Sequence, residues 1–225
     1  MGILMRDSYR EQLDDILADL VQMCQVVSSA VRSSTTALLE ADIHLAEQVI
    51  GDDEKLDHKQ ADIEARAFSL LARQSPVAGE LRTLVATLRM VTELERMGDL
   101  AAHVAKIARL RYPDTAVPEL LRPSFVRMGD VAEKMVVTAG QTLNDRNLQN
   151  AQELRDRDEE MDDLRRTQFR VLLGKDWPYS VEAAVDVALL GRYYERIADH
   201  AASMARRIIY VVTGSFPEDA DWPQP

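Results

Sequence analysis

Two stretches of equal length decide the fold: MVTELERMGDLAAHVAKIA at residues 90–108 and LGRYYERIADHAASMARRI at residues 190–208. In the first stretch, apolar side chains recur every three or four positions, at Met90, Leu94, Met97, Ala101, Val104 and Ala108. The second repeats the pattern 100 positions later, at Leu190, Tyr194, Ile197, Ala201, Met204 and Ile208. This spacing predicts two helices that each bury one face. Because both patterns keep the same register, we interpret the chain as a duplicated unit.

Capping residues and helix breakers around these stretches predict two further helices in each half. The expected helices cover about residues 8–40, 42–73 and 76–111 in the first half, and 124–144, 147–174 and 178–213 in the second. Asp42 and Asn147 are expected N-caps, because short polar side chains satisfy the first backbone N–H groups of a helix. Ser75-Pro76 and Trp177-Pro178 are expected to open the last helix of each half, because proline is favoured at the first helical position. Gly214 is expected to end the final helix.

The chain is therefore expected to be all-α, with two tandem three-helix bundles related by an internal repeat. The first repeat is expected at residues 1–112 and the second at 124–214. A linker at 113–123 contains three prolines, and a loose C-terminal tail is expected at 215–225. The sequence leaves open whether the two bundles pack end to end or side by side.

The composition limits the classes of function. Apolar residues make up 46% and charged residues 29%, which is typical of a folded globular protein. The net charge of −11 disfavours direct nucleic-acid binding, which needs a basic face. Cys24 is the only cysteine, so neither an internal disulfide nor a cysteine-based zinc site is expected. No signal peptide or membrane span is recognised, and we expect a cytoplasmic protein that reaches membranes only through partners.

Pairs of acidic residues four positions apart recur at equivalent places in the two halves. Residues with this spacing lie one helical turn apart on the same face, where their charges repel unless a cation lies between them. If the paired helices are antiparallel neighbours, four carboxylates can converge in each half. The candidate metal ligands are Asp53, Asp57, Glu95 and Asp99 in the first half, and Asp158, Asp162, Glu195 and Asp199 in the second.

These carboxylates also have an ordinary interpretation. Both pairs on the last helix of each half are expected roughly opposite the apolar stripe, on an open bundle surface. Acidic residues at such positions commonly form a solvated face, and Arg96 and Arg196 could neutralise them locally. If a metal does bind, carboxylate oxygens suit hard or borderline cations such as Mg²⁺, Mn²⁺ or iron.

The segments Leu94–Asp99, LERMGD, and Tyr194–His200, YERIADH, resemble the paired signatures of the PhoU family. The upstream segments Pro76–Arg82 and Asp53–Asp57 resemble the family as well, and the likeness extends over about residues 8–213. It implies a cytoplasmic, usually dimeric regulator with two three-helix bundles. The implied role is negative regulation of the phosphate regulon, in which the protein connects a phosphate ABC transporter ATPase with a sensor histidine kinase.

The resemblance further implies that the eight carboxylates bind a divalent metal or a metal cluster, of iron, zinc, manganese or magnesium. One departure is that Leu100 stands where the family often has a histidine after the aspartate. This puts a histidine ligand in the first half in doubt. His103, one turn beyond Asp99, is expected to be a solvated histidine.

Three other classes of protein compete with a regulator that has no catalytic activity. A di-iron carboxylate enzyme requires Glu-x-x-His motifs, and the chain has none. An all-α, metal-dependent nucleotide pyrophosphohydrolase shares the acidic helical character. However, that family pairs Glu-x-x-Glu with Glu-x-x-Asp, and Glu-x-x-Glu is absent. A helical adaptor without metal remains open. No phosphate-binding loop or nucleophile motif is present, so we expect that the protein is not an enzyme.

Overall fold

The computed structural model describes residues 2–74 and 76–217. Six long helices and one short 3-10 turn account for the regular structure of these residues, and no strand occurs among them. The elements are α1 (Gly2–Glu40), α2 (Ile43–Gln74), α3 (Gly79–Arg111), η1 (Glu119–Leu121), α4 (Arg122–Asp145), α5 (Gln149–Leu172) and α6 (Val181–Thr213). The all-α prediction, with three long helices in each half, is confirmed.

Several helix ends lie where the sequence placed them. The Asp42 carboxylate accepts hydrogen bonds from the backbone N–H groups of His44 and Leu45, each at 3.0 Å, and caps α2 as predicted. Gly214 ends α6 with a φ of 85°, in the left-handed region that glycine adopts without strain. The Asn147 side chain accepts a 3.0 Å hydrogen bond from the N–H of Gln149, beside the start of α5.

Other boundaries differ from the prediction. The proline of Trp177-Pro178 does not open α6, which begins at Val181 after Ser180, whose hydroxyl accepts a 3.1 Å hydrogen bond from the Ala183 N–H. Trp177 belongs to the preceding turn and packs edge-on against Tyr179 at 5.0 Å between ring centroids. α3 begins at Gly79, three residues after Pro76, and the expected cap Ser75 lies outside the described residues.

The remaining differences concern the first helix, the linker and the tail. α1 begins at Gly2, well before the expected start near Ser8. The expected linker contains the turn η1, and α4 already begins at Arg122. Of the expected C-terminal tail, residues 218–225 lie outside the described residues.

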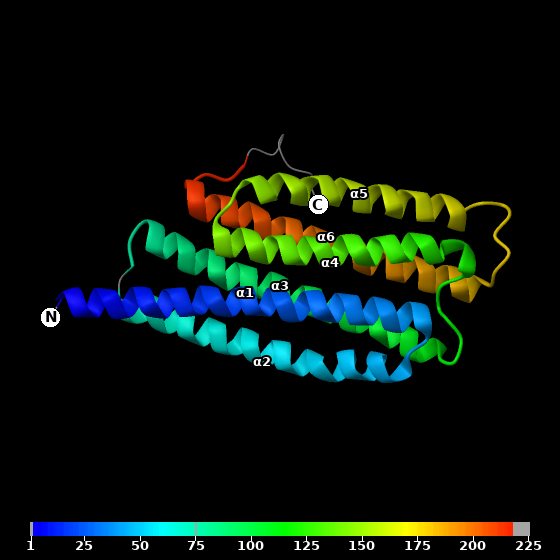
Figure 1. The fold of residues 1–225 in the computed structure, drawn as a ribbon, viewed down its shortest axis with the longest axis horizontal. Coiled ribbons are helices and arrows are strands. Elements are labelled where there is room, and N and C mark those ends of the chain that lie inside the picture. Colours follow the sequence, from blue (N-terminus) through cyan, green and yellow to red (C-terminus); the bar gives the residue numbers. More distant parts are fainter. Residues whose placement is uncertain (1, 75, 218–225) are drawn as a thin grey trace.

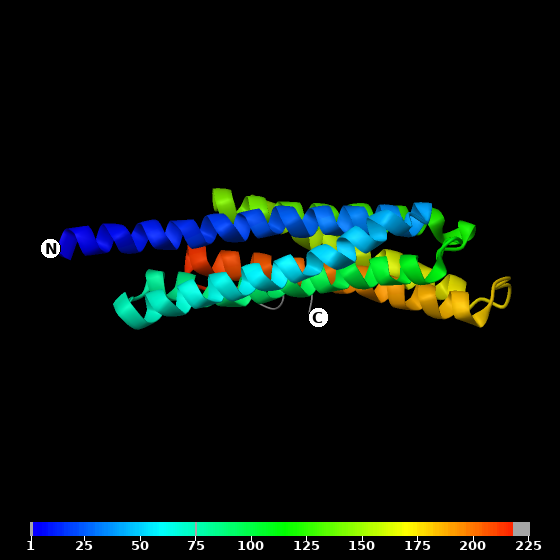
Figure 2. The ribbon, with the colours of Figure 1, turned by 90° about the horizontal axis from the view of Figure 1, so that it is seen from below.

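The two bundles lie side by side, which the sequence had left open (Figure 1). α1 packs against α4 and α3 packs against α6, so equivalent helices of the two repeats meet at the centre. α2 and α5 lie at opposite edges of the molecule (Figure 1). When the molecule is turned, α1 and α4 form one layer and α3 and α6 form the other (Figure 2).

One hydrophobic core joins the two repeats. All twelve residues of the predicted stripes are buried, within a single cluster to which all six helices contribute. Each large apolar side chain removed from water in this way stabilises the fold by roughly 1.5–3 kcal/mol. Tyr194 is fully buried, and its hydroxyl lies 2.8 Å from the Thr35 hydroxyl of the other repeat.

The α3 and α6 helices cross in antiparallel directions. Glu93 of α3 accepts hydrogen bonds from His200 at 2.7 Å and from Ser203 at 3.0 Å. His103 of α3 packs against Tyr193 of α6, with ring centroids 5.5 Å apart. Because residues 93 and 103 of α3 meet residues 203 and 193 of α6, the two helices cross close to Gly98 on α3 and Ala198 on α6.

None of the helices in the described part combines the length and the apolar character needed to cross a lipid bilayer.

Candidate functional site

The four candidate carboxylates of the first half lie near one another, between α2 and α3. We call Asp53, Asp57, Glu95 and Asp99 the first cluster. Partial burial raises the pKa of the Asp53 carboxyl above its usual value, and the negative charges of Asp99 and Asp57 raise it further. The pKa of Glu95 is raised by the same causes, burial first and then the charge of Asp99. The α2 and α3 pairs therefore act on each other, as expected for antiparallel neighbours.

The second half forms an equivalent group between α5 and α6. We call Asp158, Asp162, Glu195 and Asp199 the second cluster. Asp158 is buried, with 8% of its surface exposed, and burial followed by the charges of Asp199 and Asp162 raises its pKa to about 7. Burial, and then the charge of Glu195, also raises the pKa of Asp162 and of Asp199. The prediction that each half gathers four carboxylates agrees with this arrangement.

The sequence had suggested that the clusters lie on an open surface, and they are in fact only partly exposed. Asp57 and Asp162 are exposed, Asp158 is buried, and the other five carboxylates are half-buried. Only 16% of the Glu95 side chain is exposed, whereas Arg96 is exposed. The cause is the close approach of α2 to the flank of α3. A Cβ atom on Gly98 would lie 2.5 Å from Leu56 Cδ1 and 3.8 Å from Asp53 Oδ1, so glycine leaves the space that α2 occupies.

The two clusters differ in how closely arginine side chains contact their carboxylates. In the second cluster, the Arg165 Nε donates to Glu195 Oε2 at 2.8 Å, and Arg192 Nη1 lies 2.8 Å from the same oxygen. In the first cluster, the Arg96 guanidinium lies 3.5 Å from Glu95 and 3.7 Å from Asp99. A carboxylate that contacts two guanidinium groups is less available to a cation. The carboxylates of the first cluster are therefore more available to a cation than those of the second.

The two arginines that contact Glu195 were not predicted from the sequence. Arg96 and Arg196 were considered instead, but Arg196 lies 3.4 Å from the His200 ring rather than against Glu195. Arg192 stands one turn before Glu195, and that i, i+3 spacing was a signal that could have identified it. Arg165 comes from the neighbouring helix, so its contact depends on how α5 and α6 pack.

The histidines have contacts of their own. His103 is exposed and packs against Tyr193, in agreement with its interpretation as a solvated histidine. His200 points to Glu93 across the contact between the repeats. Although burial acts against it, hydrogen bonds from His200, Arg207 and Ser203 hold the pKa of Glu93 below its usual value. Sequence reasoning had not singled out Glu93.

The clusters offer the right donor atoms for a hard cation, because carboxylate oxygens bind such ions well. Burial first, and then the neighbouring negative charges, raise the pKa of Asp53 and of Asp158, and a bound cation would offset the part that comes from the charges. Within residues 2–74 and 76–217, however, no group of three or more Asp, Glu, His or Cys side chains is placed to hold a metal ion. Metal binding by these eight residues therefore stays a prediction.

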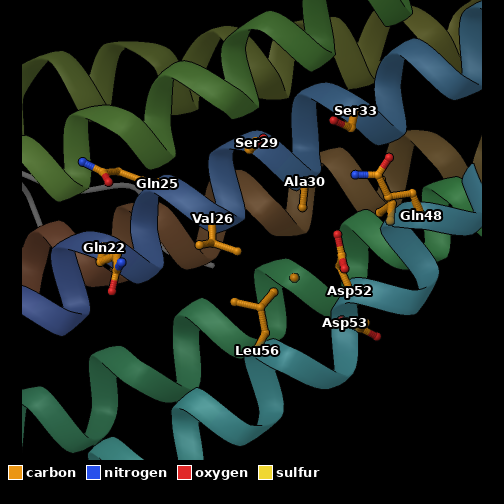
Figure 3. A pocket seen from close by; sticks show the side chains of 12 residues that line it. Gln22, Gln25, Val26, Ser29, Ala30, Ser33, Gln48, Asp52, Asp53 and Leu56 are labelled. Carbon is orange, nitrogen blue, oxygen red and sulfur yellow. The ribbon is translucent and has the colours of Figure 1, made fainter. Parts of the chain in front are cut away.

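A groove of about 350 Å³ lies next to the first cluster, between α1 and α2 (Figure 3). Three glutamines, two serines and four apolar residues of α1 and α2 line it, and Asp52, Asp53 and Gly98 lie along its α2 and α3 side. Cys24 does not line this groove, and its burial raises the pKa of the thiol to about 12.

Comparison with known proteins places these features in a family. The PhoU domain family model matches residues 20–108 and again residues 125–208. A phosphate-specific transport system accessory protein PhoU homolog 1 from Mycobacterium leprae is 47% identical over 96% of this chain and 97% of that protein. PhoU homolog 2 from Mycobacterium tuberculosis is 47% identical over 95% of this chain and its own full length. These names describe accessory proteins rather than enzymes.

The fold is also similar to solved structures. The crystal structure of PhoU from Pseudomonas aeruginosa superposes with a TM-score of 0.86 at 28% identity, and covers 92% of this chain and 100% of that chain. The phosphate transport system regulatory protein PhoU from Streptococcus pneumoniae has the same fold, with a TM-score of 0.83 at 23% identity.

Proposed function

The chain belongs to the PhoU family, and we propose that it is a negative regulator of phosphate uptake that acts on a phosphate-specific transport system. The observation that carries this proposal is similarity at 47% identity along nearly the whole length of relatives named as accessory proteins of such a system. Because the likeness includes both repeats, the whole chain and not one half is the regulatory unit.

In this proposal the protein is a cytoplasmic homodimer that connects two partners. One is the ATP-hydrolysing subunit of a phosphate ABC transporter, and the other is a sensor histidine kinase of the phosphate regulon. When phosphate is ample, the protein holds both in their silent states. The protein does this by binding and not by catalysis, and the support for this is that its relatives are named as accessory proteins.

The carboxylate clusters are proposed to select which partner is held. Asp53, Asp57, Glu95 and Asp99 would hold a divalent metal in the first half, and Asp158, Asp162, Glu195 and Asp199 in the second. A bound cation would supply positive charge that cancels the repulsion among these side chains. Without it, the same carboxylates could receive basic side chains of a partner, as Glu195 already receives Arg165 and Arg192.

Deleting the gene tests the regulatory role. In cells lacking this protein and every relative of its family, uptake of radiolabelled phosphate in phosphate-rich medium should stay at the high level of starved cells. Restoring the wild-type gene should lower it again. Uptake that is unchanged by the deletion would rule out a negative regulator, and complementation separates the effect from damage to neighbouring genes.

A further inference from the structure

The solvent-facing line of the last helix is partly repeated between the two halves. On α3 this line consists of Leu81, Val85, Arg89, Thr92 and Arg96, and on α6 of Val181, Val185, Leu189, Arg192 and Arg196. We call these the α3 line and the α6 line. At the offset of the core repeat three of the five positions match, with branched apolar residues at 81/181 and 85/185 and arginine at 96/196. The other two differ, because Arg89 corresponds to Leu189 and Thr92 corresponds to Arg192. Packing in the core requires apolar residues in the buried stripe. It does not require any particular residue type on the side of the helix that faces water.

The apolar residues of these lines are well exposed. Leu81, Val85, Val181, Val185 and Leu189 keep between 41% and 80% of their surface in contact with solvent. Single exposed apolar residues are common on protein surfaces and need no explanation. Two equivalent stripes of them, at the same turns of two related helices, are typical of a surface that another molecule covers.

The α3 and α6 lines contain four arginines and no acidic side chain, although the protein has 38 acidic and 27 basic residues. Two of these arginines, Arg96 and Arg192, also lie close to carboxylates of the first and second clusters. Arg96 and Arg196 are both exposed. The apolar and basic character of these lines is therefore complementary to an acidic amphipathic helix, which has apolar residues flanked by Asp or Glu.

The two lines share one face of the molecule. α3 and α6 form the layer opposite α1 and α4 (Figure 2). They run antiparallel and cross near Gly98, so the arginines gather close to the crossing and the apolar ends lie outermost. At 1.5 Å of rise per residue, the midpoints of the two apolar ends are separated by roughly 45 Å. A partner must therefore present the same element twice, in two-fold related positions.

We propose that the α3–α6 face is a docking surface for a two-fold symmetric partner that presents two copies of an acidic amphipathic helix. This inference rests on the proposed function, because an ABC transporter contains two ATP-hydrolysing subunits. A second copy of this chain fits the face less well, since isologous packing would oppose arginines to arginines. A membrane also fits less well, because interfacial helices need a continuous apolar face and here arginines separate the two apolar ends.

The duplication makes a quantitative expectation possible. Burying a charge in an apolar docking site removes the contact and desolvates the charge, so one aspartate in one line should weaken binding by about tenfold. If the two lines bind independently, the effects of the two substitutions should multiply. One aspartate in each line should then weaken binding by about 100-fold. Because each line carries arginines, raising the salt concentration should weaken the wild-type complex as well.

The test measures binding of the protein to the purified ATP-hydrolysing subunits of the phosphate transporter of the same organism. The variants are Val85→Asp, Val185→Asp and the double variant, with Arg96→Glu/Arg196→Glu as a second double variant that alters only charge. The matched control is Val126→Asp, because Val126 is 49% exposed and lies on α4, in the other layer. Thermal melting curves show that each variant remains folded.

The inference predicts graded loss in the single and double variants, loss in the charge variant and no change for Val126→Asp. Wild-type binding that the double variants retain would overturn the docking surface and leave the proposed function standing. A wild-type protein that does not bind the subunits would overturn both. The inference would also fail if the same variants instead abolished binding to phosphatidylglycerol vesicles, or converted a dimer to a monomer in sedimentation experiments, while binding to the subunits persisted.

Discussion

Replacing Asp158 by asparagine should make the protein more stable at neutral pH. Burial, together with the charges of Asp199 and Asp162, raises the pKa of this carboxyl from 3.8 to about 7. The folded protein therefore binds the proton more tightly than the unfolded chain does. The stabilising contribution is full below the unfolded pKa and is lost as the pH rises through the folded pKa. Above about pH 7 the folded state must hold an ionised and repelled carboxylate.

The size of the effect follows from the shift. A change of one pKa unit corresponds to about 1.4 kcal/mol, so the shift of Asp158 costs the folded state about 4 kcal/mol once the carboxyl is ionised. Asparagine has nearly the same shape and no charge. Asp158→Asn should therefore exceed the wild type in free energy of unfolding by as much as about 4 kcal/mol at pH 8. The difference should shrink steadily between pH 7 and pH 4.

The measurement is urea unfolding at pH 4 to pH 8, followed by circular dichroism, in the presence of a chelator so that no cation shields the cluster. Asp163→Asn is the matched control, because Asp163 is the exposed neighbour of Asp162 and pairs with Arg166 at the surface. It should change stability by less than about 0.5 kcal/mol at every pH. A stability difference between Asp158→Asn and wild type that does not vary with pH would refute the argument from burial and repulsion.

Two further predictions concern the clusters and the helix contact beside them. Protein purified without chelator should contain bound metal by elemental analysis, and the Asp99→Ala/Asp199→Ala variant should contain much less; equally low contents would remove metal from the proposal. Gly98→Ala should destabilise the protein by about 1–3 kcal/mol in thermal melts, because the new methyl group would collide with Leu56. Gly51→Ala, where nothing lies within 4 Å of the new methyl group, should instead stabilise α2 by about 0.5–1 kcal/mol.

The buried parts of the fold could be predicted because helical periodicity depends on local spacing alone. All twelve stripe positions, including Tyr194 and Met97, are buried as the pattern required. The cap at Asp42 was predictable for the same reason, since its hydrogen bonds reach only two and three residues along the chain. The start of α6 was misplaced because two local signals competed, and the Ser180 cap prevailed over the Trp177-Pro178 pair.

The features that sequence reasoning missed depend on packing between helices. The flank of α3 that carries Glu95 is covered because α2 approaches over Gly98, and no spacing within α3 contains that information. The same holds for Arg165, which reaches Glu195 from the neighbouring helix. The prediction that carboxylates would gather in each half required only antiparallel neighbours. Their degree of exposure required the actual distance between the helices.

The contact between α3 and α6 has a consequence for the way the duplicated halves recognise each other. Glu93 meets His200, Ser203 and Arg207, whereas its counterpart Tyr193 meets His103. A pairing of two first halves would set Glu93 against leucine, histidine and isoleucine, because these occupy the positions equivalent to 200, 203 and 207.

A pairing of two second halves would leave His200 and Arg207 facing tyrosine, with no carboxylate to receive their hydrogen bonds. The contact between α3 and α6 therefore favours the pairing of unlike halves over the pairing of identical ones. For the α3–α6 contact, the two repeats are therefore not interchangeable, although their core stripes are equivalent.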